Sequence, residues 1–394
     1  GCLCRQSGKL ITKKERLMTI PLVDLRAQYV SIKEEVDTAI RRVIEESGFI
    51  GGRFVREFEE AFAADYRVKH CVSVANGTDA IYIALKMLGI GAGHEVITTA
   101  HSWISTSEAI SQTGARPVFV DVDEFYALSA DLIEREITSA TRAIVPVHLY
   151  GQPADMTKIM TLARKYELKV VEDCAQAHYA TWGGQRVGTF GTAGTFSFYP
   201  GKNLGAYGDA GAIVTNDDDL ATRMRMYANH GALKKHQHQM EGINSRLDGM
   251  QAAILTAKLP YIHTWTERRQ QVASWYGMAL SNVIGVERPR VRQGATHVYH
   301  LYVVQTNHRD RLASYLQDHG VQTGIHYPAA LPFLDAYSCL TVDRDSKFPV
   351  AKRNARRILS LPIYPELSKQ EVDHIAGLVI RWCGAHEDFE ADCR

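Results

Sequence analysis

CVSVANGTDAIYIALKMLGIGAGHEVITTA, residues 71–100, contains two short apolar runs separated by a helical pattern. Residues 71–76 alternate in the manner of a strand, residues 78–88 have the apolar periodicity of a helix, and residues 95–100 form a second strand-like run. A strand, a helix and a second strand in this order are typical of a right-handed parallel crossover. The stretch therefore predicts a β-α-β unit.

The same alternation continues toward the C-terminus. PVFVDVD (117–123), AIVPVHLYG (143–151) and LKVVEDCA (168–175) are three more apolar runs, separated by helix-length segments. We therefore expect an α/β fold with a mostly parallel central sheet and helices on both faces. Residues 192–200 and 210–217 are joined only by a glycine-rich turn, which is too short for a crossover, so this pair should be antiparallel.

The chain of 394 residues is long for one compact core. We expect a large domain over residues 18–260 and a smaller C-terminal α/β domain over residues 261–394. Residues 1–17 precede the patterned sequence and lack a signal-peptide core, so we interpret them as a disordered leader or extension.

Composition limits the possible partners and the compartment. The 45 basic and 44 acidic residues leave a net charge of +1, which argues against nucleic acid or an anionic membrane as a partner. The seven cysteines are scattered and contain no CxxC pair, so the sequence indicates a reducing cytoplasm rather than disulfides or zinc. No apolar run reaches the roughly 18 residues of a membrane span.

Ligands of open α/β sheets bind beyond the carboxyl ends of the strands. The first such position here is ANGTDA, residues 75–80. Gly77 permits close backbone approach, and Thr78 and Asp79 lie at the start of a helix whose amides attract an anion such as phosphate. Plain helix capping is the alternative explanation.

The second position is VEDCAQAH, in which Asp173 directly follows an apolar strand and Gln176 comes three residues later. A carboxylate held here keeps a heteroaromatic nitrogen protonated, and the amide of Gln176 can donate to a ring hydroxyl. Taken alone, an acidic pair at a strand end is more commonly solvated or ion-paired.

The third position is FSFYPGKNLGAYGDAGA, residues 196–212, which places Lys202 between a strand and a glycine-rich turn. A desolvated lysine loses proton affinity and can form a Schiff base. A phosphate site, an acidic partner for a ring nitrogen and such a lysine are what pyridoxal 5′-phosphate requires. Trp103 follows another strand and is placed to stack on the ring, with core packing as its alternative role.

These motifs resemble the DegT/DnrJ/EryC1/StrS family, fold-type-I pyridoxal-phosphate aminotransferases that act on nucleotide-linked keto sugars. The similarity runs from about Ile20 to the C-terminus and includes IPLVDLRAQY, ANGTDA, EDCAQAH, FSFYPGKNLGAYGDAGA, GINSRLDGMQAAIL and GIHYP. The resemblance implies that Lys202 is the covalent lysine and proton shuttle, and that Asp173 is the partner of the pyridinium.

The resemblance also implies roles for further residues. Gln176 contacts the ring hydroxyl, Trp103 stacks on the ring, and Gly77, Thr78 and Ser197 bind the phosphate. Asn244 matches a residue that in relatives reaches the cofactor phosphate of the neighbouring subunit, so a homodimer with shared active sites is implied. Residues expected near the substrate are Tyr207, Arg246, His326 and Tyr327. For Tyr207 and Arg246, a buried aromatic at a turn and a helix-start ion pair are the alternatives.

The implied reaction has two stages. L-glutamate converts the cofactor to pyridoxamine 5′-phosphate, and a nucleotide-diphospho-keto-sugar then accepts the amino group, with Lys202 moving the proton. The segment HSWISTSEAI favours carbon 3 of a dTDP-linked 3-keto-6-deoxyhexose, with a UDP-linked 3-keto sugar or a 4-keto sugar as alternatives. Dehydratases of the family replace the lysine or add a cysteine-held cluster, and this chain does neither.

Other interpretations remain open at this point. A non-catalytic regulator that retains the cofactor fold is one, since fold does not fix function. A pyridoxal-phosphate lyase or desulfurase is another, and would act on a free amino acid. His236 and His238 lie in the basic stretch HGALKKHQHQM without acidic or cysteine partners, so we expect a solvated loop there and no metal.

Overall fold

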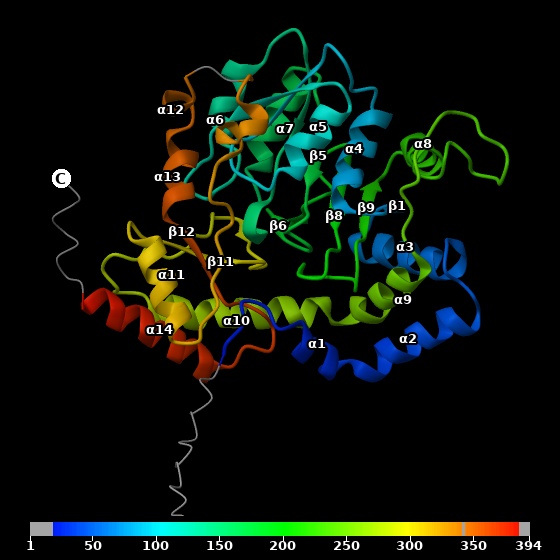
Figure 1. The fold of residues 1–394 in the computed structure, drawn as a ribbon. Helices are drawn as coiled ribbons and strands as arrows, with labels where there is room; N and C mark the ends of the chain where they lie inside the picture. The colour runs from blue at the N-terminus through cyan, green and yellow to red at the C-terminus, as the bar shows by residue number, and fades with distance from the viewer. Residues whose placement is uncertain (1–18, 341–342, 386–394) are drawn as a thin grey trace, which may run out of the picture.

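The structure is a computed structural model that describes residues 19–340 and 343–385. The predicted extension at residues 1–17 lies outside the described residues. Figure 1 shows a central sheet covered by helices, above a long layer of helices that runs along the base of the molecule.

The central sheet has seven strands in the order β1-β9-β8-β5-β4-β2-β3. Strand β9 is antiparallel to both of its neighbours, whereas the remaining pairs are parallel. The mostly parallel sheet and the antiparallel pair are therefore as the sequence predicts. The strands are β1 His70–Val74, β2 Glu95–Thr99, β3 Arg116–Val120, β4 Thr141–Val145, β5 Lys169–Asp173, β8 Ala193–Ser197 and β9 Gly211–Thr215.

Helices cover both faces of this sheet, as the sequence predicts. The helix expected at residues 78–88 spans Gly77–Met87. The helices of this part of the chain are α1 Leu25–Ser31, α2 Lys33–Glu45, α3 Gly52–Tyr66, α4 Gly77–Met87, α5 Ser105–Gln112, α6 Ala130–Ile133, α7 Met156–Lys165, α8 Asp218–Ala228 and α9 Gly249–Lys258.

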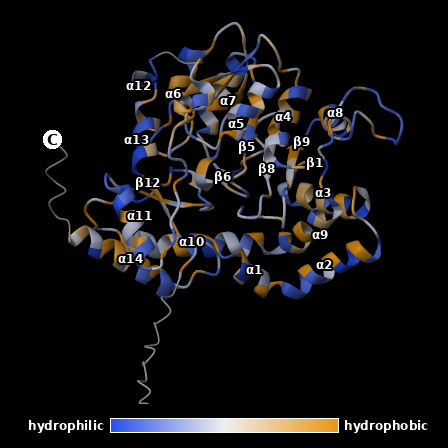
Figure 2. Ribbon diagram, viewed as in Figure 1, coloured by the Kyte–Doolittle hydropathy of each residue, from blue (hydrophilic) through white to orange (hydrophobic). Residues whose placement is uncertain are grey.

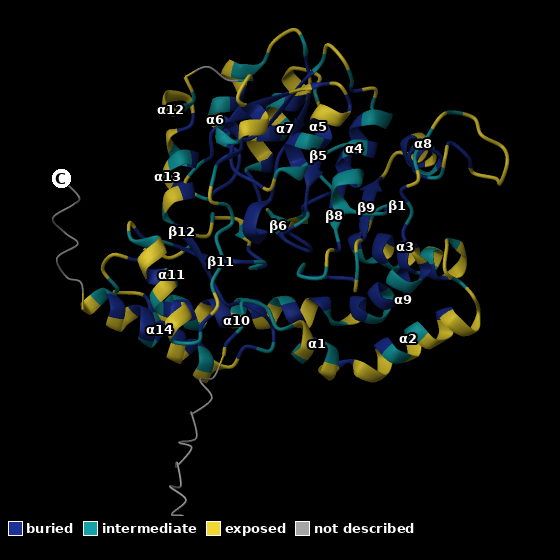
Figure 3. Cartoon of the chain, viewed as in Figure 1, coloured by how far each residue is buried: buried dark blue, intermediate teal, exposed yellow. Residues whose placement is uncertain are grey.

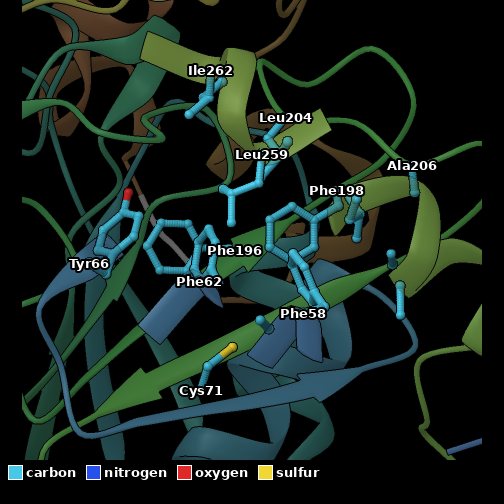
Figure 4. Close-up of a cluster of buried hydrophobic side chains, with 14 of the residues drawn as sticks. Phe58, Phe62, Tyr66, Cys71, Phe196, Phe198, Leu204, Ala206, Leu259 and Ile262 are labelled. Atoms are coloured by element: carbon cyan, nitrogen blue, oxygen red, sulfur yellow. The ribbon is translucent and has the colours of Figure 1, made fainter. Parts of the chain in front are cut away.

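Alternate side chains of the strands enter different cores. Cys71 of β1 packs into a core with α3 and α9, whereas its neighbour Val72 packs into a core with α4 and α8. The first core is rich in aromatic rings, including Phe58, Phe62 and Phe196, which are drawn in Figure 4. Figure 2 shows the corresponding pattern on α2, where hydrophobic and hydrophilic residues alternate around the helix.

A second set of elements surrounds a two-stranded sheet of β11 and β12. Its core includes Ile20 near the start of the described chain, and the long helix α10 contributes Trp265 to the first core and Val272 to this one. Whether a domain boundary falls at residues 260 and 261 stays a prediction. The elements are α10 Ile262–Ala279, β11 Tyr302–Gln305, α11 Arg309–Asp318, α12 Arg344–Lys347, α13 Pro349–Arg357, β12 Ile358–Leu361 and α14 Lys369–Gly384.

Short elements complete the chain. Strands β6 Thr181–Trp182, β7 Gln185–Arg186 and β10 Ala295–Thr296 form a small separate sheet. A 3-10 turn, Leu259–Tyr261, contains Pro260 and lies between α9 and α10. Among the described residues, no helix has the length and apolar character that a membrane crossing requires.

A buried carboxylate ties the end of β5 to the loop before β8. Glu172 is fully buried and accepts hydrogen bonds from the backbone amides of Gly188, Phe190 and Gly191, at 2.7–2.8 Å. His148 Nε2 donates to the same carboxylate over 3.1 Å, because Nδ1 of that ring already accepts from the Ala154 amide. These hydrogen bonds compensate the buried carboxylate for the loss of water. They also fix the end of β5, where the next residue is Asp173.

We expect Glu172→Gln to lower the free energy of unfolding by about 3 kcal/mol, because an amide nitrogen cannot accept from these buried donors. Urea denaturation followed by circular dichroism measures this change. Glu124→Gln is the matched control, since the Glu124–Arg290 pair is solvent-exposed and should contribute less than about 1 kcal/mol. Equal effects of the two substitutions would contradict the structural role of Glu172.

Candidate active site

A cavity of about 500 Å³ lies at the carboxyl ends of the parallel strands. This is where open α/β sheets bind ligands. The sequence-predicted residues that line it come from five separate parts of the chain: Gly77, Thr78, Trp103, Asp173, Gln176, Ser197, Lys202, His326 and Tyr327.

The start of α4 and the end of β8 form one wall of the cavity. A Cβ added to Gly77 would lie 2.6 Å from Ser197 Cβ, so only glycine allows this close approach. Asn76 caps the helix by accepting from the Asp79 amide, and the amides before it have no acceptor within the helix. The wall therefore presents backbone amides, the Ser197 hydroxyl and a helix N-terminus, a combination that suits a phosphate.

Asp173 is 5% exposed at the end of β5. Its two oxygens have different partners: Oδ2 accepts from the Thr106 hydroxyl at 2.8 Å, and Oδ1 accepts from the Ala175 amide at 3.1 Å. These bonds hold the carboxylate in one orientation against the cavity. A buried carboxylate with remaining acceptor capacity is suited to hold a protonated ring nitrogen.

Lys202 reaches the cavity from the turn after β8, where its backbone amide donates to the Tyr199 carbonyl at 2.8 Å. Burial lowers the pKa of its ammonium to about 8, against the opposing attraction of Asp173. A larger fraction of the amine is thus unprotonated near neutral pH than for a surface lysine. This is the state in which lysine acts as a nucleophile or base.

Gln176 is held at both ends of its side-chain amide. Its Oε1 accepts from the Tyr150 backbone amide at 2.7 Å, and its Nε2 donates to the Tyr327 hydroxyl at 3.1 Å. Trp103 lies beside this pair, with its ring centroid 5.4 Å from that of Tyr327. Although it lines the cavity, Trp103 is 56% exposed, which leaves a ring face free for a ligand.

Three predicted site residues do not line the cavity of this chain. The Tyr207 ring instead lies 4.4 Å from the buried Lys258 Nζ. Asn244 is exposed, next to Ser245, whose hydroxyl donates to Asp79 at 2.6 Å. Arg246 donates to Asn229, and its buried Nε has no hydrogen-bond partner among the described residues.

The sequence reasoning missed several cavity residues. Thr106, Asp209 and His300 line the cavity, and Tyr150 lies directly behind it against Gln176. Tyr150 follows β4 in AIVPVHLYG, so the rule that strand ends carry ligand sites, applied to this strand as well, would have found it. Asp209 and His300 follow no strand and gave no such signal.

Among the described residues, His148, Glu172 and Cys174 are close enough to share a metal ion. The bonds of Glu172 and His148 described above already occupy both carboxylate oxygens and both ring nitrogens. This cluster is therefore a hydrogen-bonded core rather than a metal site. In the basic loop, His238 Nδ1 lies 2.7 Å from the His230 carbonyl oxygen, and Figure 3 shows the loop after α8 as exposed.

Comparison with known proteins gives relatives that align over nearly the whole chain. A dTDP-3-amino-3,4,6-trideoxy-alpha-D-glucose transaminase of Streptomyces venezuelae is 42% identical over 92% of this chain and 96% of its own length. A UDP-N-acetyl-3-dehydro-alpha-D-glucosamine 3-aminotransferase of Acidithiobacillus ferrooxidans is 43% identical, with coverages of 92% and 97%. A Geobacillus stearothermophilus protein called pleiotropic regulatory protein is 42% identical, with coverages of 91% and 97%.

Solved structures have the same fold. The structure of S. venezuelae DesV in complex with a ketimine intermediate superimposes with a TM-score of 0.90 at 42% identity, covering 93% of this chain and 98% of DesV. The structure of NtdA from Bacillus subtilis with bound cofactor PMP gives a TM-score of 0.83 at 29% identity, covering 94% and 87%.

Residues 30–380 of the chain match the family described as the DegT/DnrJ/EryC1/StrS aminotransferase family. This range contains every residue of the cavity wall described above, from Asn76 at the start of α4 to Tyr327. Sequence motifs, strand order and cavity position agree, and the chain belongs to the DegT/DnrJ/EryC1/StrS aminotransferase family.

Proposed function

We propose that the protein is a pyridoxal-phosphate-dependent aminotransferase that moves an amino group from L-glutamate to carbon 3 of a dTDP-linked 3-keto-6-deoxyhexose. The observation that carries the proposal is the meeting of Lys202, Asp173 and the Gly77–Ser197 wall around one cavity. The relatives at 42–43% identity include transaminases of dTDP- and UDP-linked 3-amino sugars, which supports this substrate class.

The residues of the cavity fit the cofactor. The α4 amides and the Ser197 hydroxyl would hold its phosphate, Asp173 its ring nitrogen, Gln176 its ring hydroxyl, and Lys202 its aldehyde carbon. The exposed face of Trp103 would cover the ring. The family is pyridoxal-phosphate-dependent, and the B. subtilis relative contains the pyridoxamine form.

The chemistry divides between cofactor and protein. When bound, pyridoxal phosphate supplies an electron sink for the carbon that gains or loses the amino group. Asp173 keeps the ring nitrogen protonated, because its carboxylate is buried and oriented by Thr106. The amine of Lys202 accepts and returns the proton, which its lowered pKa permits near neutral pH.

We further propose that the active protein is a homodimer with shared sites. Asn244 is exposed and lies outside the cavity of its own chain. The hydroxyl of the next residue, Ser245, accepts from the Ala75 amide just before α4. Large apolar side chains are exposed on the adjoining α1–α3 region, among them Val30, Phe49 and Ile50. A second copy of the chain on this face would bury these apolar side chains. Its Asn244 would then approach the cavity wall formed by Gly77 and Ser197.

The proposed setting is a reducing cytoplasm. Four cysteines lie in the described residues, and Cys71, Cys174, Cys339 and Cys383 are all unpaired. Two of them are fully buried, where burial raises the thiol pKa well above its usual value and keeps Cys71 and Cys174 unreactive.

The proposal is tested by incubating purified protein with L-glutamate and a set of dTDP- and UDP-linked 3-keto and 4-keto sugars. We expect amination at carbon 3 of a dTDP-linked sugar, assigned by mass spectrometry and NMR. Lys202→Ala should reduce turnover by at least about a thousandfold, because proton transfer and covalent binding are both lost. Lys165→Ala, in an exposed pair with Glu134, is the control. Cofactor binding without amination of any sugar would favour a regulator.

The lowered pKa of Lys202 predicts a pH dependence. The rate at which the cofactor-free protein captures pyridoxal phosphate can be followed by absorbance. This rate should rise with pH as the ammonium loses its proton, with a midpoint near pH 8, and then level off at higher pH. A midpoint near pH 10.5, the value of an ordinary lysine, would show that the side chain is solvated rather than buried.

Shared sites predict complementation between two inactive variants. Co-expressed Lys202→Ala and Asn244→Ala chains form mixed dimers in which one site has both native residues. Random pairing makes half of the dimers mixed, so about a quarter of wild-type activity should return. If Asn244 acted in its own chain, each mixed dimer would have one site without Lys202 and one without Asn244, and activity would not return.

A further inference from the structure

The orientation of the Gln176 amide follows from its neighbours. The Tyr150 backbone N–H lies 2.7 Å from Oε1, and a backbone amide can only donate, so the atom facing it must be the carbonyl oxygen. The nitrogen of the side chain then faces Tyr327. Both amide hydrogens are therefore presented away from Tyr150. One points to the Tyr327 hydroxyl, and the other has no acceptor among the described residues.

This orientation determines the direction of the next hydrogen bond. Gln176 Nε2 donates to the Tyr327 hydroxyl oxygen over 3.1 Å, so that oxygen acts as the acceptor. The hydroxyl hydrogen of Tyr327 has no acceptor among the described residues, and the side chain lines the cavity. Tyr327 consequently presents a donor to whatever occupies the cavity.

The side chain of Tyr150 holds the same region from behind. Its ring is buried, and its hydroxyl donates to the His326 carbonyl oxygen. The hydroxyl also lies 3.2 Å from His101 Nε2, an atom 3.3 Å from the Tyr327 backbone amide. One residue thus contacts Gln176 through its backbone and the His326–Tyr327 segment through its hydroxyl.

We propose that Tyr150 is a positioning residue that joins the cofactor side of the cavity to its sugar side and sets Gln176 and Tyr327 as hydrogen-bond donors. The Tyr327 donor then selects a sugar that presents an oxygen acceptor, a carbonyl or hydroxyl, at this wall. This inference rests on the proposed aminotransferase function.

The two contacts of Tyr150 can be separated by substitution. Tyr150→Phe removes the hydroxyl, and with it the hold on His326 and Tyr327, but retains the backbone N–H that orients Gln176. The reaction with glutamate, followed as the loss of cofactor absorbance, should remain within about twofold of wild type. The KM for the keto sugar should rise about tenfold, the effect of losing a buried hydrogen bond, at nearly constant kcat.

Tyr126→Phe is the matched control. The Tyr126 ring packs against that of Tyr150 at a centroid distance of 5.1 Å, and its hydroxyl accepts from Gln305 at 2.9 Å, away from the cavity. The Tyr126→Phe substitution removes a buried hydroxyl next to Tyr150 but no contact of the His326–Tyr327 segment, so the KM for the keto sugar should not change. Tyr327→Phe removes the hydroxyl that donates into the cavity and should raise the KM for the keto sugar to a similar extent. This variant tests the proposal even if Tyr150→Phe does not fold.

The outcomes are distinguishable. Wild-type protein that aminates no keto sugar overturns the proposed function and, with it, this inference, before any variant is compared. Active wild type with an unchanged KM in Tyr150→Phe and Tyr327→Phe overturns the inference alone. Equal loss of the glutamate and sugar reactions in Tyr150→Phe also overturns it, because that pattern indicates a general structural role. An unchanged absorbance maximum of the bound cofactor, with the KM raised, supports it.

Discussion

The buried hydrogen bonds of two adjacent carboxylates, Glu172 and Asp173 at the end of β5, hold the active site in place. Successive side chains of a strand point to opposite faces, so Glu172 and Asp173 leave the strand in opposite directions. Glu172 is satisfied by backbone amides of the loop before β8 and by His148, which fixes the strand end. Asp173 is thereby presented to the cavity as a buried carboxylate oriented by Thr106.

Close backbone approach places the other parts of the site around this carboxylate. A Cβ on Gly211 of β9 would lie 2.3 Å from the Asn76 carbonyl oxygen, and one on Gly77 would lie 2.6 Å from Ser197 Cβ. The start of α4 therefore lies against the ends of β8 and β9. Lys202, in the turn that joins these two strands, lines the same cavity as the helix N-terminus. The packing of α4 against the ends of β8 and β9 thus brings an anion site and an amine to the same cavity.

Much of this arrangement could be predicted from the sequence because it follows local patterns. The strand-helix alternation gave the mostly parallel sheet, and the short glycine-rich turn gave the antiparallel pair β8–β9, both confirmed. The family assignment from motifs is also confirmed. Nine of the expected site residues line one cavity, although their chemical roles stay predictions.

The remainder depends on tertiary contacts that no local pattern encodes. Tyr150 acts on Gln176, 26 positions away, and on His326, 176 positions away. Thr106 meets Asp173 across 67 positions. Tyr207, expected near the substrate, instead contacts α9, where its ring lies over Lys258 and its backbone amide donates to Gln251. A sequence shows that such residues are polar or aromatic, but their partners are defined only once the sheet order is known.

We expect Lys202 to be the residue of this cavity that binds pyridoxal phosphate covalently. Reduction of the cofactor-loaded protein with borohydride, followed by proteolysis and mass spectrometry, tests it directly. We predict a phosphopyridoxyl group on the peptide that contains Lys202 and on no other lysine peptide. A label on a different lysine, or none after saturation with the cofactor, would contradict it.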